Sequence, residues 1–245
     1  MNENAVELRN VEMHFNMSKE KLESLKEYFL KFMKRQLYFE DFVAVDNVSF
    51  DIKKGDVFGI VGLNGCGKST TLKIISGILE PTKGTVKTYG TIAPLIELGA
   101  GFDMDLTARE NIYLNGSVLG YSKKFMDEKF DEIVEFSEMQ EFLDVPMKNY
   151  SSGMVARIGF AIATVTTPDI LIVDEILAVG DFLFQQKCEE RINAMINDDT
   201  TVIIVSHSIE QIERLCKHCV WLEKGKVKMI GEAAEVCDAY KNSQR

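Results

Sequence analysis

The chain of 245 residues is 46% hydrophobic and 27% charged, with a formal net charge of −10 at pH 7. These values are typical of a folded globular protein, predict one domain over residues 1–245, and argue against a general nucleic-acid binder, which would carry a basic footprint. The sequence has no apolar run near the roughly 18 residues of a membrane span, and the N-terminus has no signal-peptide pattern.

The first predicted strand, over 6–15, is followed by a predicted amphipathic helix over about 18–36, with Ser18 as its N-cap. Six basic and three acidic residues lie between Ser18 and Arg35, a net charge of +3 in an acidic chain. Its apolar residues share one helical face: Leu22, Leu25, Tyr28, Phe29, Phe32 and Met33. Such a helix fits a membrane surface or a membrane-embedded partner, and the alternative is an ordinary helix packed on its own domain.

The pattern next predicts a strand pair within 43–52 and a strand over 57–61, followed by a glycine-rich loop and a helix. Strand, G-x-x-x-x-G-K-[ST] and helix together predict a phosphate-binding loop. Lys68 can reach the β- and γ-phosphates, and the Ser69 hydroxyl can ligate Mg²⁺. The predicted nucleotide-binding residues are Gly62, Leu63, Asn64, Gly65, Cys66, Gly67, Lys68, Ser69 and Thr70.

Beyond the loop, the sequence predicts a strand over 85–92 and a helical insertion from 103 to 142, within a helical subdomain of about 103–165. Two apolar runs, 169–173 and 201–205, predict buried parallel strands. They end in Asp174-Glu175 and Ser206-His207, at the sheet edge where open α/β sheets place active sites. A hairpin around Gly225 and a short helix close the chain.

Polar residues at these strand ends point to phosphate chemistry. Asp174 can hold Mg²⁺ or its water shell, and Glu175 can polarise a water toward the γ-phosphate.

The five cysteines are odd in number and scattered, as in a reducing cytosol. Residues 216–219, Cys-Lys-His-Cys, form half a zinc pattern without a second ligand pair, which favours a non-metal role.

The order of motifs resembles the ATP-binding subunits of ABC transporters over nearly the whole chain, from about Val6 to Gly231. After the phosphate-binding loop come a signature at 149–154, Asp174-Glu175, an Asp loop at 178–181, and His207. Within the family, the chain is most similar to the polysaccharide-export group, on segments 97–102, 110–113, 150–154 and 178–182. The implied fold is an α/β P-loop ATPase core with a mostly parallel sheet, an antiparallel β subdomain and a helical subdomain.

The resemblance also implies residue roles. Phe15 stands where the family stacks an aromatic ring on adenine, with Phe42 as a second candidate. In a homodimer with shared ATP sites, Ser151, Ser152 and Gly153 of one copy close over the γ-phosphate held by the other, from a helix that begins just after Gly153. His207 contacts the γ-phosphate. The sequence departs from the family pattern at two places. The family signature is usually Leu-Ser-Gly-Gly-Gln, and here residues 150–154 are Tyr-Ser-Ser-Gly-Met. The family also has a glutamine that senses the metal, and its nearest match here is Glu97.

The implied function is hydrolysis of ATP, with Mg²⁺, to power export of a lipid-linked polysaccharide such as O-antigen or teichoic acid. The implied partner is a separate transmembrane permease, which places the chain at the cytoplasmic face of the membrane, with no nucleic acid and no C-terminal carbohydrate-binding domain. The basic helix over 18–36 falls where exporters of this group carry an extra helix. Alternatives are export of another substrate, or a soluble ABC-type ATPase acting on nucleic acid or ribosomes. A P-loop GTPase or kinase leaves the other motifs unexplained.

Overall fold

The structure is a computed structural model that describes residues 3–18, 39–96, 98–99, 101–174, 181–197, 200–206 and 208–244. The predicted helix over 18–36 lies outside these residues except for Ser18, which is the last residue of strand β1. Glu97, Glu175 and His207 also lie outside them. None of the described helices is long and apolar enough to cross a membrane.

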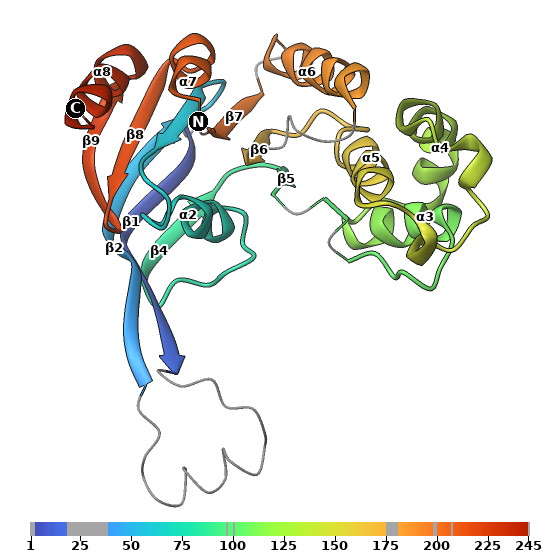
Figure 1. Ribbon diagram of the computed structural model, residues 1–245, viewed down its shortest axis with the longest axis horizontal. Coiled ribbons are helices and arrows are strands. Elements are labelled where there is room, and N and C mark those ends of the chain that lie inside the picture. Colours follow the sequence, from blue (N-terminus) through green and yellow to red (C-terminus); the bar gives the residue numbers. More distant parts are fainter. Residues whose placement is uncertain are drawn as a thin grey trace, which may run out of the picture.

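A six-stranded sheet forms the centre of the molecule, in the order β5-β6-β7-β3-β8-β9 (Figure 1). The first five strands of this order run parallel to one another, and β9 pairs antiparallel with β8. The apolar runs predicted as buried strands form its middle, with every residue of β3 and β7 buried. The strands are β3 (Val57–Val61), β5 (Ile92–Leu95), β6 (Ile170–Asp174), β7 (Thr201–Val205), β8 (His218–Glu223) and β9 (Lys226–Glu232).

Each face of this sheet builds its own core, because side chains alternate along a strand. In β6, Ile170 and Ile172 join the core beneath helix α2 (Lys68–Ile75), while Leu171 and Val173 join the core on the opposite face. Figure 1 shows the helices of that opposite face above the sheet. They are α6 (Phe182–Asn197), α7 (Ile209–Leu215) and α8 (Ala233–Ser243). Strands buried on both faces hold their carboxyl ends rigidly, which suits a site at that edge.

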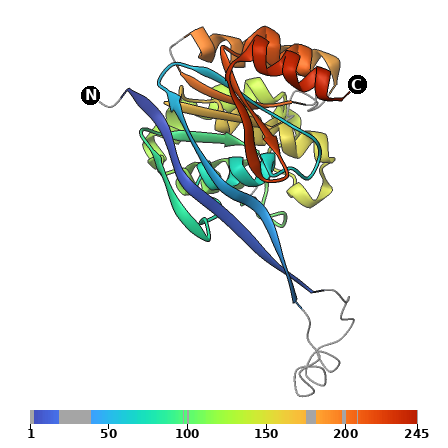
Figure 2. The same cartoon turned by 90° about the vertical axis from the view of Figure 1, so that its left-hand side faces the viewer.

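A second, antiparallel sheet has the order β2-β1-β4 and covers α2 from the other side. Its strands are β1 (Asn4–Ser18), β2 (Phe39–Lys53) and β4 (Lys83–Thr88). β4 pairs with β1 over residues 6–12, and beyond this point β1 and β2 continue as a two-stranded ribbon that leaves the body (Figure 2).

Two strand predictions are wrong in detail. Residues 43–52 are part of one continuous strand, β2, and not a strand pair. The single strand predicted over 85–92 is two strands in different sheets, β4 and β5. The chain breaks between them at Gly90, whose φ of 119° favours glycine. A Cβ there would lie 2.4 Å from Asp169 Cβ, so the turn needs a residue without a side chain.

Three helices, α3 (Ala108–Val118), α4 (Lys123–Ser137) and α5 (Ser152–Ala163), gather on one side of the sheets around a third core (Figure 1). Thr107 and Glu110 form a capping box at the start of α3, and the Ser122 hydroxyl caps α4. Two short 3₁₀ turns, η1 (Gln140–Phe142) and η2 (Met147–Asn149), lead from α4 to α5. The sequence predicts a helical region here, and the structure has one.

Candidate nucleotide site and signature helix

The phosphate-binding loop follows β3 directly and ends in α2, whose N-cap is Gly67. Gly62 has φ of 148° and Gly67 has φ of 102°. A Cβ on Gly62 would lie 2.3 Å from the carbonyl oxygen of Leu222, and one on Gly67 would lie 2.5 Å from that of Ala44. Both contacts are too short for any side chain, so these glycines let the loop turn tightly against β8 and β2. No side chain caps α2, and backbone N–H groups at a helix start favour an anion.

The ammonium of Lys68 lies against carbonyl oxygens of the phosphate-binding loop. Its side chain is buried, and Nζ donates to the carbonyl oxygens of Gly62 at 2.8 Å and Leu63 at 3.1 Å. Among the described residues these two carbonyls are its hydrogen-bond partners, and an ammonium has a third donor for a phosphate oxygen. Ser69 is exposed in the first turn of α2, and Thr70 follows it.

The loop contains one cysteine, Cys66, a residue type whose thiol can be reactive. Its thiol is 5% exposed, and burial raises its pKa even though the nearby Lys68 charge opposes the shift. A thiol that stays protonated adds no negative charge to a site for a polyanion. Cys66 therefore packs as a small apolar residue beneath the loop.

Asp174 is brought to the same edge of the sheet by strand register. It pairs with Val205 of β7, and Val205 pairs with Ile60 of β3, two residues before Gly62. Neighbouring strands lie about 4.8 Å apart, so Asp174 lies roughly 10 Å from Ile60 across two strand spacings. The carboxyl ends of β6, β7 and β3 thus meet where the loop begins, as open α/β sheets require of a ligand site.

The two aromatic candidates for adenine lie opposite each other. Phe15 of β1 pairs in register with Phe42 of β2, so both rings share one face of the ribbon. Phe15 packs partly against the first core, while Phe42 is 42% exposed. Two residues after Phe42, the strand reaches Ala44, whose carbonyl borders Gly67. Phe15 and Phe42 therefore both stay candidates for the adenine contact, and they form one cross-strand pair.

The signature residues form the start of helix α5, which begins two residues earlier than predicted. α5 begins at Ser152 and not after Gly153, because Ser151 is the N-cap: its hydroxyl accepts a hydrogen bond from the Met154 N–H at 3.2 Å. Ser151 and Ser152 are exposed. Among the described residues, a Cβ on Gly153 would meet one atom, Ser151 Oγ, at 3.8 Å, so this part of the chain leaves space around Gly153.

Loop and signature are not brought together within one chain. Among the described residues no hydrogen bond joins 62–70 to 151–153. Gly65, at the tip of the loop, also has no described atom within 4 Å of its Cβ position. Two helix N-termini are thus polar and accessible: that of α2, beside the sheet, and that of α5, among the helices α3 to α5.

The side chains of the Cys-Lys-His-Cys segment, residues 216–219, do not point to one common site. Cys216 and Cys219 are buried, and burial raises the pKa of the Cys216 thiol to about 12. The His218 ring points elsewhere, with Nδ1 2.8 Å from Asp56 Oδ2. The described residues hold no group of three or more metal-ligating side chains.

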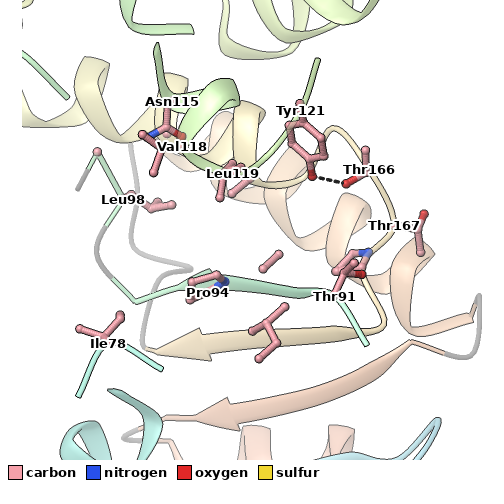
Figure 3. A pocket seen from close by; sticks show the side chains of 16 residues that line it. Ile78, Thr91, Pro94, Leu98, Asn115, Val118, Leu119, Tyr121, Thr166 and Thr167 are labelled. Atoms are coloured by element: carbon pink, nitrogen blue, oxygen red, sulfur yellow. Dashed lines mark hydrogen bonds between the residues drawn. The ribbon is translucent and has the colours of Figure 1, made fainter. Parts of the chain in front are cut away.

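One pocket of about 540 Å³ was not foreseen from the sequence (Figure 3). It lies between the open edge of β5 and the ends of α3 and α5, with Ile78 at one side. Val118 of α3 and the next residue, Leu119, lie across the pocket from Pro94 of β5 and from Thr91, the residue before β5. At one end, Tyr121 and Thr166 share a hydrogen bond of 2.7 Å. Val118, which lines the pocket, is 69% exposed. Because its lining comes from segments distant in sequence, no local pattern marks it.

Comparisons with known proteins agree with this geometry. The family model for ABC transporters matches residues 45–178. The O-antigen export system ATP-binding protein RfbB of Klebsiella pneumoniae is 44% identical and covers 82% of both chains. The teichoic acids export ATP-binding protein TagH of Lactiplantibacillus plantarum is 40% identical over 98% of this chain and 65% of that protein.

Solved structures with low identity share the fold. One of an ATP-binding subunit of an ABC transporter gives a TM-score of 0.73 at 21% identity, over 97% of this chain and 93% of that one. A dimeric post-hydrolysis state of the cassette MJ0796, bound to ADP and Pi, gives 0.72 at 22% identity, over 93% and 98%.

The mixed sheet with its glycine-rich loop defines a P-loop ATPase of the ATP-binding cassette type. The chain belongs to the ABC transporter family, as an ATP-binding subunit that hydrolyses ATP. The predicted family and fold class are confirmed.

Proposed function

We propose that this chain is the ATPase subunit that powers export of a lipid-linked polysaccharide through a separate membrane permease. The observation that carries the proposal is identity of 40–44% with proteins named for O-antigen export and for teichoic acid export, over 82–98% of this chain. One name gives O-antigen as the exported material and the other gives teichoic acids. The cargo class that we infer for this chain is a lipid-linked polysaccharide, with the chain at the cytoplasmic face of the membrane. We treat residues 1–245 as one ATP-binding domain with its helical subdomain over about 103–165.

At the nucleotide, the loop 62–68 and the start of α2 wrap the phosphates with backbone N–H groups, and the third donor of Lys68 binds a β- or γ-oxygen. Phe15 or Phe42 stacks on the adenine. The Ser69 hydroxyl and the Asp174 carboxylate fit Mg²⁺, which prefers oxygen ligands and waters. When bound, Mg²⁺ neutralises charge on the β- and γ-oxygens. Glu97, a further metal candidate, follows β5 by two residues.

Hydrolysis needs a water in line with the bond to the γ-phosphate. Glu175, the residue after Asp174, accepts a proton from that water as it attacks, and the products are ADP and inorganic phosphate. His207, two residues after the end of β7, contacts the γ-phosphate. These roles are supported by the position of both residues, in sequence, just beyond strand ends that meet at the loop.

A second copy of the chain completes each site. Ser151, Ser152 and Gly153 of one copy meet the γ-phosphate held by the other, with the N-terminal N–H groups of α5 as donors. The open space around Gly153 supports this, because glycine costs a helix up to about 1 kcal/mol relative to alanine and no described residue requires a glycine there. A two-fold dimer would form two such sites.

The shared site predicts that the ATPase rate per subunit rises with protein concentration when the subunit is alone, and levels off once dimers dominate. Dilution removes the second copy and with it half of each site. Steady-state ATPase over a thousandfold range of concentration, with mass measured at each step, checks this. A constant rate per subunit in a confirmed monomer contradicts the shared site.

The pocket beside β5 supports a permease partner. Its walls come from the core strand β5 and from α3 and α5 of the helical side, so a segment seated there contacts both parts (Figure 3). Burying one aliphatic side chain stabilises a complex by about 1.5–3 kcal/mol, and Ile78, Val118 and Leu119 are exposed for such contacts. The basic segment over 18–36 is a second surface for the membrane or permease.

Cells that make this chain provide the test of the proposal. Lys68→Ala, which removes the ammonium at the phosphates, and Val118→Glu, which charges the pocket, should each abolish surface polysaccharide and leave lipid-linked polymer inside. Lys68→Ala should lose ATP binding, whereas Val118→Glu should bind ATP normally, because an exposed substitution changes stability by about 0.5 kcal/mol or less.

Ile230→Glu is the matched control, since Ile230 is also exposed but lies on β9, at the opposite edge of the sheet from β5. It should leave export unchanged. Normal surface polysaccharide in cells whose only copy carries Lys68→Ala would show that another substrate is moved.

A further inference from the structure

Tyr150 is the residue directly before Ser151, the N-cap of the signature helix, and its side chain bonds back to the chain that leads there. Its hydroxyl donates a hydrogen bond of 2.6 Å to the backbone carbonyl of Phe142, eight residues earlier, at the end of the turn η1. The two rings also meet edge to face, with centres 6.4 Å apart and an interplanar angle of 78°. The Tyr150 side chain therefore closes the segment between η1 and α5 into a loop.

The carbonyl that accepts this bond belongs to a turn that is itself well held. The same Phe142 carbonyl accepts the Val145 N–H at 2.9 Å. The carbonyl of the next residue, Leu143, accepts the N–H of Arg109, in the first turn of α3, at 3.0 Å. Phe142 is thus fixed by its own turn and by α3, so the Tyr150 hydroxyl ties the start of the signature to that helix.

Backbone hydrogen bonds hold the chain before the signature only as far as residue 148. Met147 and Lys148 donate to carbonyls of the segment 104–106, at 2.9 and 2.8 Å. The next two N–H groups donate within their own turn, and the two serines of the signature are exposed. Among the described residues, the Tyr150 hydroxyl therefore makes the side-chain hydrogen bond that joins this last step before α5 to another part of the chain.

The Tyr150 phenol is a donor at neutral pH. Burial and, to a smaller extent, the negative charge of Asp144 raise its pKa above the ordinary value, so the phenol stays protonated. Leucine, the usual residue at this position of the family signature, has no hydroxyl to donate. The tyrosine is one of the departures of this sequence from the family pattern, and the structure gives it a specific contact.

We propose that Tyr150 is a positioning residue for ATP hydrolysis, whose hydroxyl fixes the start of α5 so that the signature N–H groups point at the γ-phosphate of a second copy. The proposal rests on the shared site proposed above. Donors to a reacting phosphate stabilise it only when they are already held at hydrogen-bond distance. The first turn of α5 follows Tyr150 directly, so loss of its anchor lets that turn move with the exposed chain before it.

The test compares Tyr150→Phe with the unmodified full chain by steady-state ATPase assays. This variant removes the hydroxyl and keeps the ring. It should lower kcat by about 3–10-fold, within the range that one neutral hydrogen bond contributes to an equilibrium. Tyr150→Leu, which also removes the ring, should lose at least as much. ATP affinity of the dilute chain should stay within about twofold, because ATP binds at loop 62–70. Amide exchange of the Met154 N–H should be faster in both variants.

Tyr113→Phe is the matched control. The Tyr113 hydroxyl donates to Asp127 at 2.9 Å and its ring stacks on Phe130, so it joins α3 to α4 beside the same core without touching the signature. It should keep kcat within about 1.5-fold and leave Met154 exchange unchanged. A normal kcat in Tyr150→Phe or Tyr150→Leu, an equal loss in Tyr113→Phe, or unchanged Met154 exchange in the slow variants would each overturn the proposal. The concentration dependence of the unmodified protein tests the shared site separately.

Discussion

Replacing Glu175 with glutamine is expected to lower steady-state ATP hydrolysis by about 10²–10⁴-fold, the range that a general base supplies. The amide has the size of the carboxylate but accepts no proton from the attacking water. ATP binding should be unchanged, because the loop, Lys68 and Ser69 are intact. The bound γ-phosphate then keeps both copies closed, so a stable dimer should accumulate with ATP and Mg²⁺. Turnover assays, nucleotide titration and light scattering on a sizing column measure these three outcomes.

Two controls separate this effect from damage to the site. Lys68→Ala should lose ATP binding and therefore form no trapped dimer. Asp174→Asn should weaken binding of Mg²⁺ and ATP together, since it changes a metal ligand and not the base. Rapid turnover by Glu175→Gln, or a monomer in the presence of saturating ATP, contradicts the role of Glu175 as the base.

The parts of this site that the sequence predicts well are those written in consecutive residues. Loop 62–69 has its flanking strand and helix within a few residues, so one local pattern carries both the chemistry and its context. Likewise, 201–205 is an apolar run that is fully buried as β7. Asp174 was predicted beside the loop because parallel strands share an edge, and register alone brings it there.

The parts that the sequence predicts poorly depend on contacts between distant segments. Residues 85–92 have strand character throughout, but Gly90 must turn close to Asp169, which no local pattern contains. Helix α5 begins at Ser152, earlier than predicted, because the Ser151 hydroxyl accepts a hydrogen bond from the Met154 N–H. Alternative N-cap residues differ by only small free energies, so the sequence does not fix the first residue of the helix. The hydrogen bonds of Arg157 in α5 to Glu138, the C-cap of α4, and to Asp181, the residue before α6, likewise join segments that are distant in sequence.

Gly153→Asp is expected to lower ATP hydrolysis by about 10²–10³-fold, the cost of losing one well-placed donor to a reacting oxyanion, without destabilising the chain. Of the residues described within one copy, a Cβ at Gly153 meets Ser151 Oγ alone, at an ordinary contact distance of 3.8 Å. A carboxylate in the first turn of a helix is also favourable by about 0.3–1 kcal/mol. In the dimer, the same carboxylate faces the γ-phosphate of the second copy and repels it.

Gly159→Ala, on the same helix, should have the opposite profile. A Cβ there lies 2.8 Å from the Gly99 backbone nitrogen, so overpacking should destabilise the chain by about 1–3 kcal/mol, with no new group near a phosphate. Thermal unfolding and ATPase assays on both variants therefore separate the fold from the shared site. If Gly153→Asp hydrolyses ATP normally, or melts as early as Gly159→Ala, then the start of α5 does not meet the nucleotide of a second copy. If it is stable and inactive, the space around Gly153 serves another molecule's phosphate, since no contact among the residues that the structure describes requires a glycine there.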